Sequence, residues 1–183
     1  SFLTNNFFAW IAKNIMPSKR PMDNMDININ SPQEEELILL CQSGHSIYNM
    51  WVAPKNQMEV WKQYGRLEDP HYKKLWSDGY IRMLKTSTFH FGGKRLLLKN
   101  PPNTARIPYL IEQFPNAKFI HIYRNPYKVY ASTTKMYRDV LNFFQFHDEV
   151  AEDVDNGIVE IYKDVYDAYN THKHLIPKEN LLE

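Results

Sequence analysis

The chain has 183 residues, a length typical of one domain, and its 43% hydrophobic and 14% aromatic content is ample for a packed core. A net charge of +1 argues against a broad polybasic surface for nucleic acid or membrane, and no apolar run approaches the roughly 20 residues of a membrane-spanning helix. The single cysteine, Cys41, excludes an internal disulfide and fits a reducing compartment, so we expect a cytoplasmic protein.

The two ends of the sequence indicate an internal piece of a longer protein. The chain opens with Ser1 and runs directly into an apolar segment, for which we predict a packed helix over Phe2–Ile15. This segment lacks the charge pattern of a signal peptide. At the other end, Lys178–Glu183 has the pattern of a strand that is just beginning. We therefore expect a single domain over residues 1–183 that is incomplete at both ends.

A helix is predicted to begin at Ser31, with Ser31 as its N-cap and Pro32 as its first residue. The acidic residues Glu34–Glu36 then lie in the first turn, where they favour the helix dipole. Ser31 and Glu34 also have the spacing of a capping box. A purely structural role for Glu34 therefore stays open beside a catalytic one.

The middle of the chain predicts two aromatic-rich helices, Gln57–Tyr64 and Tyr72–Thr86. His90, between two phenylalanines, is interpreted as a packed histidine rather than a base, and Gly92-Gly93 predicts a turn. Most of the large side chains of this region are expected in the core or a lid, and some in an acceptor pocket. They are Trp51, Trp61, Tyr64, Trp76, Tyr80 and Met83.

The segment 95–138 is expected to be the centre of the fold. Two apolar runs, Arg95–Lys99 and Lys118–Tyr123, predict short strands, and apolar residues within 107–114 recur between them at helical spacing. A strand, a helix and a strand over so few residues predict parallel strands joined by a right-handed crossover. The expected fold class is therefore α/β, with a parallel sheet flanked by helices.

Each predicted strand ends in a cation, Lys99 or Arg124, and in open α/β sheets ligands bind outside that edge. A second helix follows, with Asn125 as N-cap and Pro126 as its first residue. Its N-terminus attracts anions, whereas a lone cation beside it is disfavoured by about 0.3–1 kcal/mol. The spacing of Arg124 and Ser132 allows a guanidinium and a hydroxyl to share one phosphate. These residues predict an anion site.

Further helices are predicted over Asp148–His174, with Gly157 as a candidate break. His172 and His174 lack the i, i+4 spacing of common paired metal ligands, and no Cys/His cluster surrounds them. We therefore predict no metal site.

The run from Phe114 to Pro126, with Ser132 eight residues after Arg124, resembles the 3'-phosphate-binding segment of sulfotransferases that use PAPS (3'-phosphoadenosine 5'-phosphosulfate). In that family the matching Arg and Ser hold the 3'-phosphate. Lys99 resembles the family lysine that neutralises the sulfuryl group and its leaving phosphate. The resemblance implies a P-loop NTPase-like fold. It also implies PAPS as co-substrate and an acceptor that carries a hydroxyl or, less readily, an amine.

The resemblance also bears on the general base, the group that takes the proton of the acceptor. Some sulfotransferases, including those acting on protein tyrosine, use a glutamate at the head of a helix, which Glu34 and Glu35 resemble. The cytosolic branch instead uses a histidine two residues after the strand-end lysine, where this chain has Pro101. This departure points to Glu34 or Glu35 as the base and leaves the choice between them open.

One part of the family pattern is missing. The P-loop-like strand, loop and helix that cradle the 5'-phosphosulfate have no counterpart, since no glycine here belongs to a G-x-x-x-x-G-K-[ST] loop. The loop either precedes Ser1 or has been lost, and the piece alone is expected to be inactive. Three alternatives stay open: a P-loop-type nucleotide kinase, which would need Mg²⁺ ligands; a phosphonucleotide-binding module without catalysis; and a purely structural domain.

Overall fold

A computed structural model describes residues 34–144 and 151–183, together with Trp10, Lys19 and Asp26. Contacts within the chain divide it into two units, Ser1–Gln33 and Glu34–Glu183. In the first unit, Trp10 is helical and Lys19 forms an isolated antiparallel bridge with Asp26. The rest of the helix predicted over Phe2–Ile15 lies outside the described residues, as does Ser31 itself. The start predicted for the next helix at Ser31 was wrong, because the helix begins at Glu35, and Glu34 is its N-cap in extended conformation rather than a residue of its first turn.

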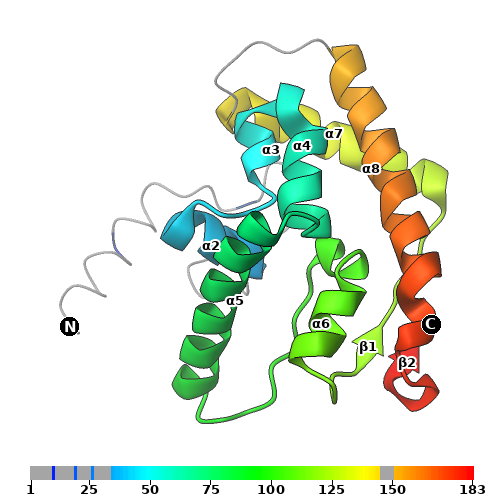
Figure 1. The fold of residues 1–183 in the computed structure, drawn as a ribbon. Helices are drawn as coiled ribbons and strands as arrows, with labels where there is room; N and C mark the ends of the chain where they lie inside the picture. Colours follow the sequence, from blue (N-terminus) through cyan, green and yellow to red (C-terminus); the bar gives the residue numbers. More distant parts are fainter. Residues whose placement is uncertain (1–9, 11–18, 20–25, 27–33, 145–150) are drawn as a thin grey trace. The chain divides into compact units, whose positions relative to one another are not determined.

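The second unit is mostly helical and contains a small parallel sheet (Figure 1). Its longer helices are α2 (Glu35–Ser43), α5 (Pro70–His90), α6 (Ile107–Gln113), α7 (Pro126–Phe144) and α8 (Ala151–His172). The shorter elements are α3 (Asn49–Val52), α4 (Gln57–Val60), the 3₁₀ turns η1 (Pro54–Asn56), η3 (Pro101–Thr104), η4 (Lys173–Leu175) and η5 (Lys178–Asn180), and the π-helical η2 (Trp61–Arg66).

The sheet joins β1 (Phe119–Ile120) and β2 (Leu181–Leu182), which are parallel, with Phe119 opposite Leu181. The backbone N–H of His121 extends the ladder by donating to the carbonyl of Leu182 at 2.8 Å. The strand expected to begin within 178–183 is therefore confirmed. The strand predicted over 118–123 is confirmed for two of its residues.

The prediction of a strand over Arg95–Lys99 was wrong, because residues 94–100 have no regular secondary structure. An extended segment needs a hydrogen-bonded neighbour to be stable as a strand. The sheet of the described residues contains only β1 and β2 and offers this segment no neighbour. Leu97 is accordingly 89% exposed. The predicted strand–helix–strand unit thus keeps its helix and part of its second strand but lacks its first.

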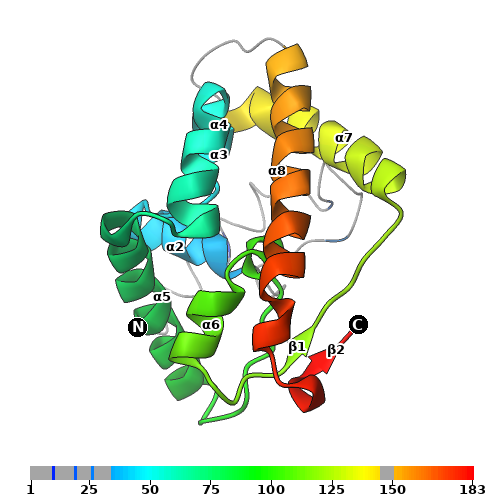
Figure 2. The same ribbon diagram turned by 45° about the vertical axis from the view of Figure 1, so that its right-hand side comes forward.

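The core of the second unit is aromatic, as predicted: Trp61, Trp76, Tyr80 and Met83 are buried. Trp76 stacks on Tyr80 with their ring centroids 4.4 Å apart. α2 and α5 pack against each other, and α8 runs beside α4 and α6 (Figure 2). A smaller apolar cluster lies next to the sheet and consists of Ile107, Tyr169 and Ile176.

Of four local predictions, those for the cap at Asn125 and the turn at Gly92-Gly93 are confirmed. Those for a break at Gly157 and a packed His90 were wrong. Asn125 caps α7 as predicted, its Oδ1 accepting from the backbone N–H of Tyr127 at 3.0 Å, and Gly92 and Gly93 adopt positive φ in a turn. α8, however, runs through Gly157 without a break. His90 is exposed at the end of α5, so its interpretation as a packed residue was wrong.

Candidate functional site

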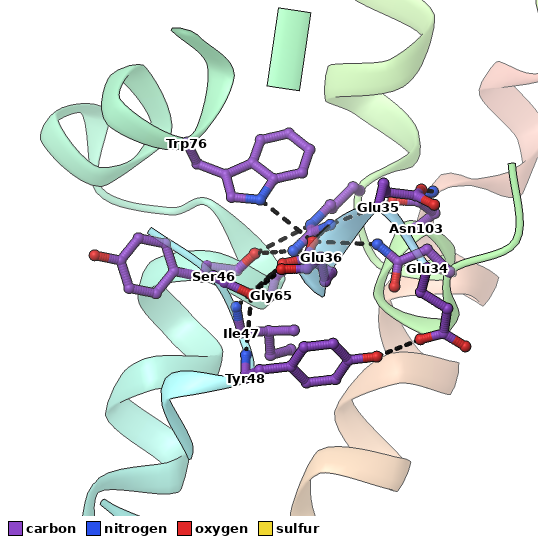
Figure 3. Close-up of polar contacts among 12 residues, drawn as sticks. Glu34, Glu35, Glu36, Ser46, Ile47, Tyr48, Gly65, Trp76 and Asn103 are labelled. Atoms are coloured by element: carbon purple, nitrogen blue, oxygen red, sulfur yellow. Dashed lines mark hydrogen bonds and ion pairs between the residues drawn. The ribbon is translucent and has the colours of Figure 1, made fainter. Parts of the chain in front are cut away.

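Three consecutive glutamates stand at the start of α2, with Glu34 as the N-cap and Glu35 and Glu36 in the first turn. Each of them binds a different side chain from the segment 99–106, which begins at the last residue of the predicted strand. Figure 3 shows the three glutamates together with Tyr48, Trp76 and Asn103. These two stretches are more than 60 residues apart in the sequence. Their contacts hold the head of α2 against the loop that carries Lys99.

Glu34 contacts the ammonium group of Lys99 and also accepts a hydrogen bond from the hydroxyl of Tyr48. The Glu34 side chain is 23% exposed and that of Lys99 is 75% exposed, so the ion pair faces solvent. Burial, followed by the interaction with Glu34, raises the pKa of Tyr48 well above its ordinary value. Tyr48 is therefore a stable donor to the carboxylate.

Glu35 is buried and accepts a hydrogen bond of 3.0 Å from the side-chain amide of Asn103. Burial raises the pKa of this carboxyl, and the bond from Asn103 offsets only part of that effect. The two candidate bases thus differ in their surroundings. Only Glu34 touches the predicted catalytic lysine.

Glu36 forms a fully buried ion pair with Arg106, with Oε1 2.6 Å from Nη1. Burial alone would raise the pKa of Glu36, but the charge and hydrogen bonds of Arg106 outweigh it and hold the pKa below its ordinary value. Further donors complete the network around this carboxylate. They are the hydroxyl of Ser46 at 2.8 Å, the backbone N–H of Ile47 at 3.2 Å, and the side chains of Trp76 at 3.3 Å and Asn100 at 3.1 Å.

Arg106 links this network to the π-helical η2. Its Nε donates to the backbone carbonyls of Tyr64 at 3.1 Å and Gly65 at 3.3 Å, and its Nη1 also donates to Asn103 Oδ1 at 3.3 Å. The guanidinium carbon lies 4.2 Å from the ring centroid of Trp76. Tyr64 and Gly65 lie in the last turn of η2, where the carbonyls have no partner within the helix and can accept other donors. One arginine therefore fixes α2, α5, η2 and the 99–106 segment together.

The predicted anion site lies at the start of α7 and shares no described contact with Glu34 or Lys99. Arg124 is exposed, and the Ser132 hydroxyl donates to the carbonyl of Val129 at 2.9 Å. Arg124 lines a cavity of about 400 Å³ between the start of α7 and the C-terminal half of α8. Other residues that line this cavity are His121, Tyr123, Tyr166, Tyr169 and Lys173. The structure therefore brings Glu34 and Lys99 together and leaves Arg124 with a solvent-facing guanidinium.

Three residues of this site, Tyr48, Glu36 and Arg106, were not predicted from the sequence. One signal pointed to Glu36, because it lies three residues before Leu39 and hence on the same face of α2. Helical spacing therefore placed it on the buried side. Nothing in the order of residues pairs it with Arg106, which lies 70 positions further on.

The described residues contain neither a metal-binding cluster nor a membrane-spanning helix. Among them, no group of three or more His, Cys, Asp or Glu side chains lies close enough to hold a metal ion. None of the described helices is long and apolar enough to cross a membrane.

Comparison with known proteins identifies the class. The chain belongs to the sulfotransferase family, whose model matches residues 8–183, and this confirms the resemblance inferred from the 114–132 segment and Lys99. It is similar to the omega-hydroxy-beta-dihydromenaquinone-9 sulfotransferases Stf3 of Mycobacterium bovis and Mycobacterium tuberculosis, with 31% identity over 184 residues. The alignment covers 100% of this chain and 47% of each relative, so the chain spans about half their length. No solved structure matches the chain.

Proposed function

We propose that the protein transfers a sulfuryl group from PAPS to an acceptor hydroxyl. Family membership supports the reaction class. The observation that carries the assignment of residues is the contact between Lys99 and Glu34, because a cation for the transferring group and a base for the acceptor must meet at one place. Sixty-five positions separate them in the sequence, and the fold places them side by side.

The reaction assigns one role to each residue. The acceptor oxygen attacks sulfur, the bond from sulfur to the 5'-phosphate oxygen breaks, and the acceptor proton passes to the Glu34 carboxylate. The products are a sulfate ester and 3',5'-ADP. Lys99 stabilises the negative charge that develops on the transferring group and the bridging oxygen. We assign the base to Glu34 rather than Glu35, since Glu35 is buried and held by Asn103.

We assign recognition of the 3'-phosphate to Arg124 and Ser132. The Arg124 guanidinium is exposed beside the N-terminus of α7, where an anion is favoured. It presents a planar fork that matches phosphate oxygens. The Ser132 hydroxyl donates to the Val129 carbonyl and keeps its lone pairs, so it needs to rotate to donate to a phosphate.

For the acceptor we propose an apolar alcohol. The support is the relatives, whose names specify sulfation of a hydroxylated menaquinone. We further propose that the reaction takes place in the cytoplasm, where a protein with one free cysteine stays reduced.

The test compares two nucleotides by calorimetry, with the protein in the full length that its gene encodes. The wild-type protein should bind 3',5'-ADP more tightly than ADP. Arg124→Ala should remove this preference, with a loss of roughly 10- to 100-fold for 3',5'-ADP, as expected for a hydrogen bond to a charged group. ADP binding should change little. Lys118→Ala, which removes another exposed cation, is the matched control.

Equal losses for both nucleotides would overturn the role of Arg124. If the protein bound 3',5'-ADP tightly but transferred no sulfuryl group from PAPS to any alcohol of a panel, it would instead be a phosphonucleotide-binding module without catalysis.

A further inference from the structure

The C-terminal end of α5 carries an exposed patch that the proposed reaction does not use. Phe89 is 89% exposed and Phe91 is 55% exposed. The chain then turns at Gly92 and Gly93, both with positive φ, and the N–H of Gly93 donates to the carbonyl of Thr88 at 2.8 Å. We call this patch the α5 tip and define it as Phe89 and Phe91 with the four neighbouring cations Arg82, Lys85, Lys94 and Arg95.

The members of the α5 tip lie together because of helical spacing and the turn. Arg82, Lys85 and Phe89 are three, four and seven positions apart and so share one exposed stripe of α5. The opposite face carries the buried residues Trp76, Tyr80 and Met83. After the turn, the backbone N–H of Lys94 still contacts the carbonyl of Phe91 at 3.5 Å. Figures 1 and 2 show this end of α5 at an edge of the second unit.

Charge is distributed very unevenly around the α5 tip. The segment from Gly79 to Ile111 contains six Lys and Arg residues and no Asp or Glu, although the whole chain has a net charge of only +1. Two of the six, Lys99 and Arg106, are neutralised by Glu34 and Glu36. The other four are the cations of the tip, all exposed, and within the described part of the chain none of them forms an ion pair.

We infer that the α5 tip docks the protein onto an anionic lipid bilayer. Phenylalanine has no hydrogen-bonding group in its side chain. Moving two exposed rings from water into the headgroup boundary therefore lowers the free energy. The flanking cations meet the negative surface of the bilayer, where each Lys or Arg contributes about fivefold to binding. This combination of apolar rings and cations matches the chemistry of an interfacial surface.

A bilayer fits the tip better than the alternatives. A nucleic acid is bound mainly through many phosphate contacts, whereas the tip offers four cations on a nearly neutral chain. A second copy of the chain would bring the same positive charges together. Docking itself does not depend on the chemistry of the site. Its biological purpose rests on the proposed function, since an enzyme acting on an apolar alcohol must reach the membrane that dissolves this alcohol.

The experiment is vesicle sedimentation with the full-length protein, using phosphatidylcholine vesicles and vesicles of phosphatidylcholine with one quarter phosphatidylglycerol. The wild-type protein should bind the anionic vesicles, and less so as salt is added. The triple variant Lys85→Gln, Lys94→Gln and Arg95→Gln should bind them on the order of a hundredfold more weakly. The double variant Phe89→Ser and Phe91→Ser should lose at least about tenfold. All changed side chains are exposed, so the variants should melt like the wild type.

The matched control removes three exposed cations elsewhere, by Lys62→Gln, Lys163→Gln and Lys178→Gln, and has the same net charge as the triple variant. It should retain binding. Failure of the wild type to sediment, or an equal loss in the control, would overturn the proposal. So would tip-dependent binding of a single-stranded oligonucleotide, or tip-dependent dimers by gel filtration, without vesicle binding. Binding of 3',5'-ADP, measured in parallel, reports separately on the proposed function and should be the same in all variants.

Discussion

At the scale of single residues, the buried Glu36 depends on Arg106 for its charge. Both side chains are fully buried, and Arg106 also satisfies carbonyls of η2. Removing one partner of such a pair leaves an uncompensated buried charge, which typically costs about 3–5 kcal/mol. The isosteric change Glu36→Gln keeps the shape of the side chain and removes only its charge.

We expect Glu36→Gln to lower the free energy of unfolding at pH 7 by about 3–5 kcal/mol. The folded-state pKa of Glu36 is lower than its ordinary value of 4.5, so its contribution is fully present above that value and is lost as the pH falls through the folded-state pKa. The difference between wild type and variant should therefore shrink in acid. Urea denaturation at a series of pH values measures it. A difference that stayed constant with pH would contradict the role of the charge.

The different surroundings of Glu34 and Glu35 predict different effects when each is changed to glutamine. Glu34→Gln should lower turnover by about 10²- to 10⁴-fold, the usual contribution of a general base, with little change in affinity for 3',5'-ADP. Glu35→Gln should have a much smaller effect, since Glu35 is buried against Asn103 and does not touch Lys99. Steady-state kinetics of the full-length protein with PAPS decides between them. A larger loss in the Glu35 variant would transfer the role to that residue.

At the scale of secondary-structure elements, the π-helical η2 positions the acceptors of Arg106. Gly65 is buried within it, and a Cβ atom at this position would lie 2.2 Å from the ring of Trp61. Only a residue without a side chain allows the indole to pack this closely. The local shape of η2 thus depends on Gly65 and Trp61 together.

Gly65→Ala should therefore force Trp61 or the backbone of η2 to move, at a cost of about 1–3 kcal/mol in the free energy of unfolding. Gly79→Ala is the comparison, because a Cβ there meets the end of the Leu39 side chain at 3.2 Å and the Ser43 hydroxyl at 3.5 Å, both much farther than the Trp61 ring from Gly65, and α5 gains helix propensity. Chemical denaturation of both variants measures the difference. Equal stabilities would show that the Trp61 contact does not constrain η2.

At the scale of the whole molecule, the second unit exposes apolar side chains along extended segments. Leu97 is 89% exposed, and Ile120 and Ile122 are 61% and 74% exposed. Extended chain with apolar side chains and unpaired backbone groups is a template for pairing with another copy. We expect the 183-residue chain by itself to self-associate as its concentration rises.

Leu97→Lys should reduce this self-association, since a charge on an extended edge opposes pairing. Leu175→Lys, at a 44% exposed position of η4, should leave it unchanged. Sedimentation velocity over a range of concentrations gives the result. A wild-type chain that stays monomeric throughout would contradict the expectation.

The sequence predicted features whose causes are local. Asn125 and Pro126 predicted the start of α7, and the large apolar side chains of the aromatic-rich helices were mostly expected in the core, where Trp76 and Tyr80 lie. The strand over Arg95–Lys99 was predicted from its apolar residues alone, but a strand also needs a neighbour, and the described sheet supplies none. The pairing of Glu36 with Arg106 likewise depends on a contact across 70 positions, which one sequence does not reveal.

The single cysteine gives the site a natural reporter. Cys41 is exposed on α2, seven residues after Glu34, or about 10 Å along the helix axis at 1.5 Å per residue. In the 183-residue chain, a thiol-reactive fluorophore would attach at this one place without prior mutagenesis. Its emission would then test, in real time and from the far end of the same helix, the proposed binding of a nucleotide next to Lys99.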